Sequence, residues 1–344
     1  MIFLQTHIFS GVREEATKQF PFCIRKTDTA RFSCFYRILP YGIICNKSQL
    51  LYGVNGMKFL KSVLGILRTN KDVYDNGNGD LSVNTAKRGN QQNLAEKILT
   101  AQNGKTHLFA TGQAGFIIKS AGGQLLAIDL YLSEGEKQFK GDNGFKRLLP
   151  VILQPDALLF DVVICTHPHF DHFDTASVPV MLKNKRTKLF CSADCEKLVR
   201  KLRMGRNKEQ IQYIKPGDRV ASGDFDIMFV NCDHGTGAPD AVGVVVKVDG
   251  KTIYEAGDTC LRLDRTSEIP QPLDVLIAPV NGAYGNMNEA ECAMLAEALQ
   301  PKVTVPCHYG MFAFHHGDVG LFYEIMKEKR LPLLIMQQGE HFIL

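Results

Sequence analysis

The segment from His167 to His172 brings several potential metal ligands together in this 344-residue chain. It has the pattern H-x-H-x-D-H, in which the polar side chains are those of His167, His169, Asp171 and His172. A short apolar run at 161–165 precedes the pattern and predicts a buried strand. The ligands then lie on the loop that leaves the C-terminal end of this strand, where α/β folds place their chemistry.

The spacing of the cluster suits a pair of metal ions. His167 and His169 are two residues apart in an extended loop, so their side chains project to the same side and can share one ion. Asp171 and His172 then turn toward a second ion. A lone histidine is interpreted as a polar core or surface residue, but burying this whole cluster without an ion would leave its members competing for hydrogen bonds. The density of the cluster therefore predicts metal binding.

Three later segments each end an apolar strand on a polar side chain that can bind a metal. They are 231–234 after the strand 225–230, 255–259 after the strand 251–254, and 306–310 after the strand 302–305, and they contribute His234, Asp258 and His308. Any one of them alone is weak evidence, because a strand followed by His or Asp is common. Their joint presence downstream of the cluster, in this order, is much stronger evidence for a dinuclear site.

The ordered set resembles the metallo-β-lactamase superfamily, whose pattern is H-x-H-x-D-H followed by a His, an Asp and a His. The resemblance covers about residues 105–344 and implies an α/β (α+β) fold, an αββα sandwich of two β-sheets packed face to face with helices outside. It also implies that one metal is bound by His167, His169 and His234 and the second by Asp171, His172 and His308, with Asp258 bridging the two ions.

Within the superfamily, four phrases are similar to the L-ascorbate-6-phosphate lactonase branch. They are Tyr213–Asp218, Ile253–Thr259, Pro279–Gly282 and Val305–Phe312. The similarity implies a metal-dependent hydrolase that opens a lactone or related ester, with a phosphorylated sugar lactone such as L-ascorbate 6-phosphate as the expected substrate.

The expected mechanism follows from two adjacent divalent cations. Water bound to the ions loses a proton near neutral pH, and the resulting hydroxide attacks a carbonyl carbon, with Asp171 or Asp258 orienting it. His and Asp ligands suit zinc or manganese, and iron is also compatible. The same chemistry opens esters, amides and phosphodiesters, so the motif leaves the substrate open. The alternatives are a phosphodiesterase such as the tRNA 3′-processing nuclease, and a metal-free binding protein on the same fold.

Residues near the strand-end ligands are candidates for holding the substrate. They are Asn281, Tyr284, Asn286, Tyr309, His315 and His316. The pair His315–His316 is the most suggestive, because two imidazolium groups could meet a phosphate. A purely structural role remains the alternative for each candidate. In the resembling family an Asp at the end of an early strand orients a metal-bound histidine, which assigns a supporting role to Asp129.

Two similar β-hairpins support a two-sheet architecture. The first pairs 115–120 with 124–129, and the second pairs 243–248 with 251–254 across a turn at 249–250. Each hairpin opens a half of the chain in which strands and helices alternate, so we expect two sheets packed face to face with helices outside. A helix is predicted over 286–299.

Composition limits the classes of binding partner and the cellular compartment that we expect. The net charge of +4 is small for this length, and the sequence has no run of basic residues of the kind that binds along a nucleic-acid backbone. We therefore expect a small anionic substrate and no nucleic acid. No apolar run is long enough to cross a bilayer, and the first residues lack a signal-peptide pattern. The chain holds ten cysteines. Five of them lie in or beside apolar strands and are interpreted as reduced, namely Cys165, Cys191, Cys232, Cys260 and Cys307. We expect a cytoplasmic protein, and a homo-oligomer is compatible with the sequence.

The domain organisation is predicted as a weakly patterned N-terminal extension, 1–104, followed by the hydrolase-like domain, 105–344. Residues 1–56 show no pattern that can be tied to the fold. Met57 would start a plausible protein, and we hypothesise that residues 1–56 are not part of the native protein.

Overall fold

Apolar strands from residue 107 onward form two large β-sheets in the computed structural model. The structure describes residues 93–134 and 145–344 in full, together with the backbone of five earlier strands. These strands are β1 (Pro21–Cys23), β2 (Ser33–Leu39), β3 (Gly42–Cys45), β4 (Lys71–Asp75) and β5 (Leu81–Thr85). The hypothesis about residues 1–56 falls on a segment that, apart from β1–β3, lies outside the described residues.

The chain divides into two compact units. The first unit spans Met1–Arg68 and contains the antiparallel sheet β1-β2-β3. The second unit spans Thr69–Leu344 and contains the antiparallel pair β4 and β5 and the two large sheets.

The first large sheet has seven strands in the order β11-β10-β9-β8-β7-β6-β18. Their bounds are β6 (His107–Gly112), β7 (Gly115–Lys119), β8 (Leu125–Ile128), β9 (Val162–Cys165), β10 (Lys188–Ser192), β11 (Ile211–Ile214) and β18 (His341–Ile343). Strands β8 to β11 run parallel, whereas β6, β7, β8 and β18 pair antiparallel.

The second large sheet has six strands in sequence order, β12 to β17. Their bounds are β12 (Arg219–Ser222), β13 (Phe225–Asn231), β14 (Val242–Val248), β15 (Lys251–Glu255), β16 (Val275–Pro279) and β17 (Val303–Cys307). Strands β12 to β15 pair antiparallel, and β15, β16 and β17 run parallel. Both predicted hairpins are present, as β7–β8 and β14–β15.

The period-two alternation of the strands divides the core between two layers. In β7, Phe116 and Ile118 join residues such as Val244 of β14 in a cluster drawn from both sheets. Ile117 projects to the other face and joins a second cluster with Ile98. Because the pleat points successive side chains to opposite faces, a strand that is buried on both faces reads as a continuous apolar run. The predicted sandwich of two packed sheets is confirmed.

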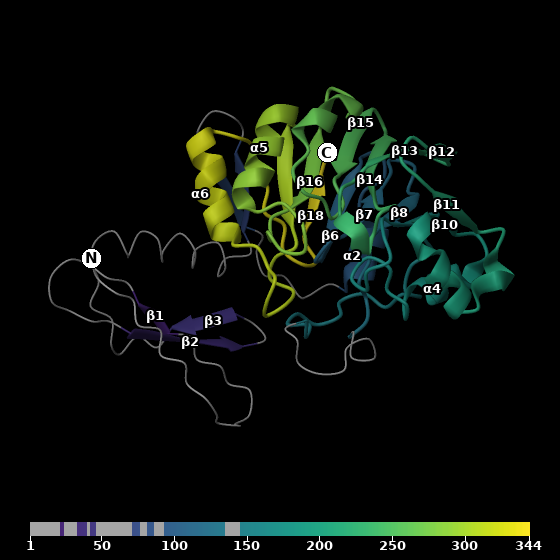
Figure 1. Cartoon of the computed structure of the whole chain (residues 1–344), viewed down its shortest axis with the longest axis horizontal. Coiled ribbons are helices and arrows are strands. Elements are labelled where there is room, and N and C mark those ends of the chain that lie inside the picture. The colour runs from purple at the N-terminus through teal and green to yellow at the C-terminus, as the bar shows by residue number, and fades with distance from the viewer. Residues whose placement is uncertain are drawn as a thin grey trace, which may run out of the picture. The chain divides into compact units, whose positions relative to one another are not determined.

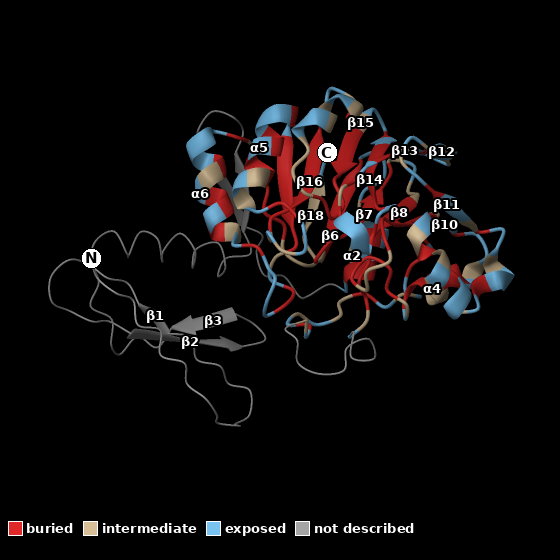
Figure 2. Cartoon of the chain, in the orientation of Figure 1, coloured by how far each residue is buried: buried red, intermediate tan, exposed pale blue. Residues whose placement is uncertain are grey.

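Helices cover the outer faces of the sheets. They are α2 (Leu94–Thr100), α3 (Val178–Met181), α4 (Glu196–Lys201), α5 (Glu289–Leu299) and α6 (Val319–Lys329). Figure 1 shows α5 and α6 side by side next to β16, with α4 near β10 and β11 at the other end of the domain. Figure 2 shows buried strands and exposed outer faces on α5 and α6.

Local capping chemistry sets where these helices begin. The Asn288 side chain accepts from the backbone N–H of Glu291, and the Glu291 carboxylate accepts from the backbone N–H of Asn288. This capping box satisfies donors that the first turn leaves free, so α5 starts at Glu289 and not at the predicted Asn286. None of the helices in the described part of the chain has the length and apolar character needed to span a membrane.

Candidate metal centre

The sequence-predicted ligands meet at one edge of the sandwich, where both sheets present the ends of strands. The loop after β9 carries the H-x-H-x-D-H pattern, and His234 follows β13 of the other sheet. Asp258 follows β15, and His308 follows β17 directly. Strand ends are rigid supports, so side chains from four separate segments are held at fixed positions relative to one another.

The first cluster consists of His167, His169, His234 and Asp258, whose candidate ligand atoms all lie within 4.8 Å of one another. The Nδ1 atom of His169 lies 3.0 Å from Nε2 of His167 and 3.1 Å from Nε2 of His234. Tetrahedral zinc sites have metal–nitrogen bonds that place neighbouring ligand atoms about 3.3 Å apart. The spacing of these ring nitrogens therefore fits a single divalent ion.

The histidines of the first cluster are in the protonation state that a metal requires. Burial lowers the pKa of His167 well below its ordinary value and also lowers the pKa of His169. Burial lowers the pKa of His234 to about 4. Neutral imidazole keeps a lone pair for a metal, so at neutral pH no proton competes at this cluster.

The second cluster consists of Asp171, His172 and His308, and Asp258 lies between the two clusters. The Oδ2 atom of Asp258 faces the first cluster, 3.6 Å from Nε2 of His234. Its Oδ1 atom faces the second cluster, 2.7 Å from Nε2 of His308 and 3.3 Å from Nε2 of His172. One carboxylate thus presents one oxygen to each cluster, which is the arrangement expected of a bridging ligand.

Unpaired polar atoms test whether metal ions fit here. Nε2 of His172, Nε2 of His308 and Oδ1 of Asp258 are buried and make no hydrogen bond within the described residues. These atoms are close, but their directions do not match a hydrogen bond between them, and buried polar atoms are rarely left without a partner. An ion placed among the three would satisfy all of them, so the residues present fit a divalent ion at the second cluster.

Asp129 orients His172 from behind the second cluster. Its carboxylate is fully buried, and its Oδ2 atom lies 2.6 Å from Nδ1 of His172. Thr166 donates to the same carboxylate from its backbone N–H at 2.8 Å and from its hydroxyl at 2.6 Å. A proton held on Nδ1 leaves the Nε2 lone pair of His172 pointing at the cluster.

The same carboxylates control the charge of His172. Burial acts to lower the pKa of His172, but Asp258, Asp129 and Asp171 together outweigh burial and raise the pKa well above its ordinary value. In the second cluster, therefore, an incoming metal ion has to displace a proton from His172.

Gln113 is a residue of the site that sequence reasoning missed. It lies in the turn between β6 and β7, is buried, and has a left-handed backbone with φ of 57°. Its Nε2 atom lies 2.9 Å from Oδ2 of Asp171 and 2.9 Å from Nδ1 of His308. One amide thus positions two members of the second cluster. Left-handed backbone at a non-glycine residue is uncommon and costly, and it is found preferentially at functional sites.

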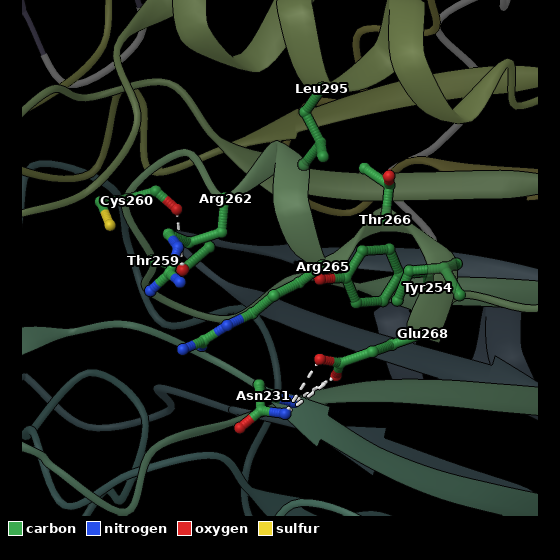
Figure 3. A pocket seen from close by; sticks show the side chains of 10 residues that line it. Asn231, Tyr254, Thr259, Cys260, Arg262, Arg265, Thr266, Glu268 and Leu295 are labelled. Carbon is green, nitrogen blue, oxygen red and sulfur yellow. Dashed lines mark hydrogen bonds between the residues drawn. The ribbon is translucent and has the colours of Figure 1, made fainter.

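Hydrogen bonds also join the loop of His234 to the loop of Asp258. Arg262 donates to Oδ2 of Asp233 at 2.7 Å, and the backbone N–H of Asp233 donates to the Thr259 hydroxyl at 3.0 Å. Figure 3 shows Arg262 beside Thr259 and Cys260, next to a small cavity of about 20 Å³. That volume holds about one water molecule, so this side of the loops is packed and supports the site.

A larger cavity of about 150 Å³ opens over both clusters. Its lining consists of Gln113, Phe145, His169, Phe170, Asp171, His234, Asp258, Asn281, Tyr284, Asn286, His308, Phe312 and His315. The structure therefore brings Asn281, Tyr284, Asn286 and His315, among the predicted substrate contacts, to the cavity. It does not bring Tyr309 or His316 there, because the Tyr309 hydroxyl donates to the carbonyl of Met336 and the exposed His316 lies against the carbonyl of Gly317.

Aromatic rings form one side of this cavity. We call the set Phe145, Phe170, Phe312, Tyr284 and His315 the aromatic wall. The phenylalanines were not expected from the sequence. Phe170 lies inside the H-x-H-x-D-H pattern, where its position between two ligands was the only available signal.

Comparisons with known proteins identify the relatives of this chain. Residues 140–309 match the model of a family described as "Beta-lactamase superfamily domain". A "UPF0173 metal-dependent hydrolase" from Myxococcus xanthus is 31% identical over 235 residues, covering 63% of this chain and 75% of that protein. A protein of the same description from Saccharolobus solfataricus is 28% identical over 197 residues, covering 56% of this chain and 85% of that protein. A solved metallo hydrolase from Ignicoccus hospitalis has a similar fold, with a TM-score of 0.53 and 22% identity over 70% of this chain and 98% of that chain.

Proposed function

The chain belongs to the UPF0173 family of metal-dependent hydrolases within the β-lactamase superfamily, and from this premise we propose that it opens a lactone or related ester with two divalent ions. The observation that carries the proposal is the position of the Asp258 carboxylate, which presents one oxygen to each ligand cluster. A carboxylate so placed can hold two ions close together, as hydrolytic two-metal sites require.

The residues that would hold the ions fall into two sets joined by Asp258. His167, His169 and His234 form the first set, and Asp171, His172 and His308 form the second. Divalent ions in such a site supply a nucleophile at neutral pH by lowering the pKa of bound water, and they polarise the oxygen of the substrate. Zinc, manganese and iron all suit these His and Asp ligands.

The chain's own groups position the reactants. Asp171 lines the cavity, and its Oδ2 atom is held at 2.9 Å by Gln113, which fixes the carboxylate where it can accept a proton from the attacking water. Asp258, which also lines the cavity, is the second candidate to orient the attacking water. Asp129 keeps the ring of His172 in one orientation through the 2.6 Å contact with Nδ1. Fixed dipoles of this kind need no rearrangement during the reaction.

The substrate is proposed at the level of a lactone or related ester. The similarity to the lactonase branch makes a phosphorylated sugar lactone, such as L-ascorbate 6-phosphate, the first compound to test. Asn281, Tyr284, Asn286 and His315 line the cavity and are the candidates to contact it. A phosphate in this cavity would have the metal ions as its positive partners and His315 as a candidate hydrogen-bond partner.

A phosphodiesterase is the less favoured candidate. Binding of nucleic acid depends chiefly on Lys and Arg contacts to phosphates. No Lys or Arg lines the cavity within the described part of the chain, and the net charge of the whole chain is only +4. A cytoplasmic location and action on a small molecule remain parts of the proposal.

A substrate panel tests the function. The full-length chain, loaded with zinc or manganese, is assayed against lactones, carboxylic esters and phosphodiesters in parallel. We expect turnover of at least one lactone or ester, and loss of that turnover when a chelator removes the metal. Exclusive turnover of phosphodiesters would contradict the proposal and support the nuclease alternative.

A further inference from the structure

The aromatic wall is continuous from the ligand clusters to the rim of the cavity. The ring centroids of Phe145, Phe170 and Phe312 each lie 5.7 Å from the other two. His315 stacks on Phe145 with centroids 5.0 Å apart, and the Tyr284 hydroxyl lies 3.1 Å from Nε2 of His315. Because Phe170 is flanked in sequence by His169 and Asp171, the wall begins directly beside the ligands.

Buried contacts hold the wall in place. Arg147 is buried and donates to the carbonyls of Tyr131 at 2.7 Å and Leu149 at 2.8 Å. The backbone N–H of Leu148 donates to the carbonyl of Met311 at 2.8 Å, which ties the segment of Phe145 to the loop of Phe312. The wall is therefore a preformed surface, and a ligand that packs on it need not order it first.

The other side chains of the cavity offer little to a charged substrate. Beyond the ligands and the wall, the described lining is completed by the neutral amides of Gln113, Asn281 and Asn286. Asn286 donates to Oδ1 of Asn281 at 3.1 Å, and Asn281 donates to the carbonyl of His315 at 3.1 Å. The amide nitrogens of Asn281 and Asn286 are thus already engaged, and that of Gln113 contacts Asp171 and His308. Oδ1 of Asn286 is buried without a hydrogen-bond partner among the described residues, but as an acceptor it offers nothing to an anion.

The cavity is large enough to admit a flat ring. Its volume is about 150 Å³, and an apolar cavity of about this size in another protein takes up benzene. Aromatic faces and edges attract further rings in offset or edge-on arrangements. A flat, apolar substrate group as large as a phenyl ring therefore has a matching surface on the wall, beside the ligands.

We propose that the substrate is an uncharged lactone or ester that carries an aromatic or similarly broad apolar group, which packs on the aromatic wall. This inference rests on the proposed function and specifies its substrate class. The carbonyl lies over the ligand clusters while the ring contacts Phe145, Phe170 and Phe312. A phosphorylated sugar lactone is the competing class.

Kinetics on matched lactones test the inference. The metal-loaded full-length chain is assayed on γ-butyrolactone carrying either a phenyl or a methyl group at the same ring carbon, and on a phosphorylated sugar lactone. We expect kcat/KM to be at least about tenfold higher for the phenyl compound, because more apolar surface is buried. Phe145→Ala should lower the phenyl-to-methyl ratio about tenfold. Tyr213→Ala, which removes an exposed ring on β11 outside the cavity lining, should leave the ratio unchanged.

A binding measurement separates this inference from the proposed function. Calorimetry compares phenyl- and methyl-substituted γ-lactams, whose amide bond is much less reactive than the lactone ester. Stronger binding of the phenyl lactam than of the methyl lactam, with a smaller difference in Phe145→Ala, supports the inference. This result would support the inference even if the protein hydrolysed no lactone. Failure to hydrolyse any lactone or ester would overturn the proposed function alone. The inference is overturned if the phenyl and methyl compounds have equal kcat/KM and equal binding affinity, or if kcat/KM is highest for the phosphorylated lactone. Either result leaves the hydrolase proposal standing.

Discussion

The ligand clusters and the aromatic wall line the same cavity but are built differently. The ligands stand at the ends of buried strands in both sheets, as His308 does after β17, and their positions follow from the sandwich itself. The wall comes from loops, such as the segment of Phe145, that are held by a few hydrogen bonds. Rigid strand ends suit chemistry that tolerates little displacement, whereas loops can vary without disturbing it. The difference suggests that reaction type and substrate preference are set by separate parts of the molecule.

The largest expected effect is the loss of the carboxylate shared by both clusters. Asp258→Ala should lower kcat/KM at least about a thousandfold, because both ions lose a ligand that holds them together. The control is Asp226→Ala, an exposed acid on β13 away from the cavity. Steady-state kinetics and metal analysis measure both variants. Activity within tenfold of the unchanged protein in Asp258→Ala would show that the shared carboxylate is not needed.

A smaller effect is expected from changing Asp129, which contacts His172 on the side away from the cluster. Asp129→Asn should weaken metal binding about 10- to 100-fold, because an amide cannot hold the proton of His172 as a carboxylate does. Asp161→Asn is the matched control, since the Asp161 carboxylate also lies at a strand end and accepts a backbone N–H, that of Leu125 at 2.9 Å. Competition with a chromophoric chelator gives the affinities, and thermal unfolding shows whether both variants fold. Equal affinities in the two variants would refute the orienting role of Asp129.

The stability of the metal-free protein and its affinity for metal should change with pH in opposite directions. The pKa of His172 is raised in the metal-free fold, so its proton stabilises the metal-free protein below that pKa and this stability is lost as pH rises through it. Metal must displace the same proton, so affinity should increase with pH by up to about tenfold per unit over the same range. Calorimetry in buffers of different ionisation enthalpy measures the protons released. A pH-independent affinity between pH 6 and 8 would contradict the assignment.

The smallest expected effect concerns the N-terminus. Deleting residues 1–56 should leave folding and hydrolysis unchanged, because this segment falls within the unit Met1–Arg68, outside the unit that contains the site. Deleting residues 1–104 should cost several kcal/mol, because it removes the buried Leu94 and Ile98 of α2. Thermal unfolding of both deletions compares them. An insoluble or inactive protein lacking residues 1–56 would show that this segment supports the domain.

The sandwich was predictable, and the candidate ligands could be named, because their signals are local. Strand periodicity marks β7, β8, β14 and β15 wherever they lie in space, and the H-x-H-x-D-H spacing identifies ligands by residue type alone. The finding that Asp258 presents separate oxygens to His234 and His308 agrees with the bridging position that the resemblance implied.

The cavity lining was less predictable because it depends on contacts between distant segments. Gln113 reaches Asp171 and His308 only after β6 and β17 are placed in their sheets, and a glutamine in a turn carries no signal by itself. Tyr309 and His316 adjoin residues of the site in sequence, but backbone directions carry their side chains elsewhere. Sequence proximity to a ligand is thus a poor guide to which side chains face the cavity.

The most direct test of the central claim is the metal content of the full-length chain and of His169→Ala. Elemental analysis after purification without chelator, and again after incubation with zinc or manganese, should give about two divalent ions per unchanged chain. His169→Ala should retain about one, because its ring belongs only to the first cluster. A protein that binds no divalent ion under either condition would contradict the account.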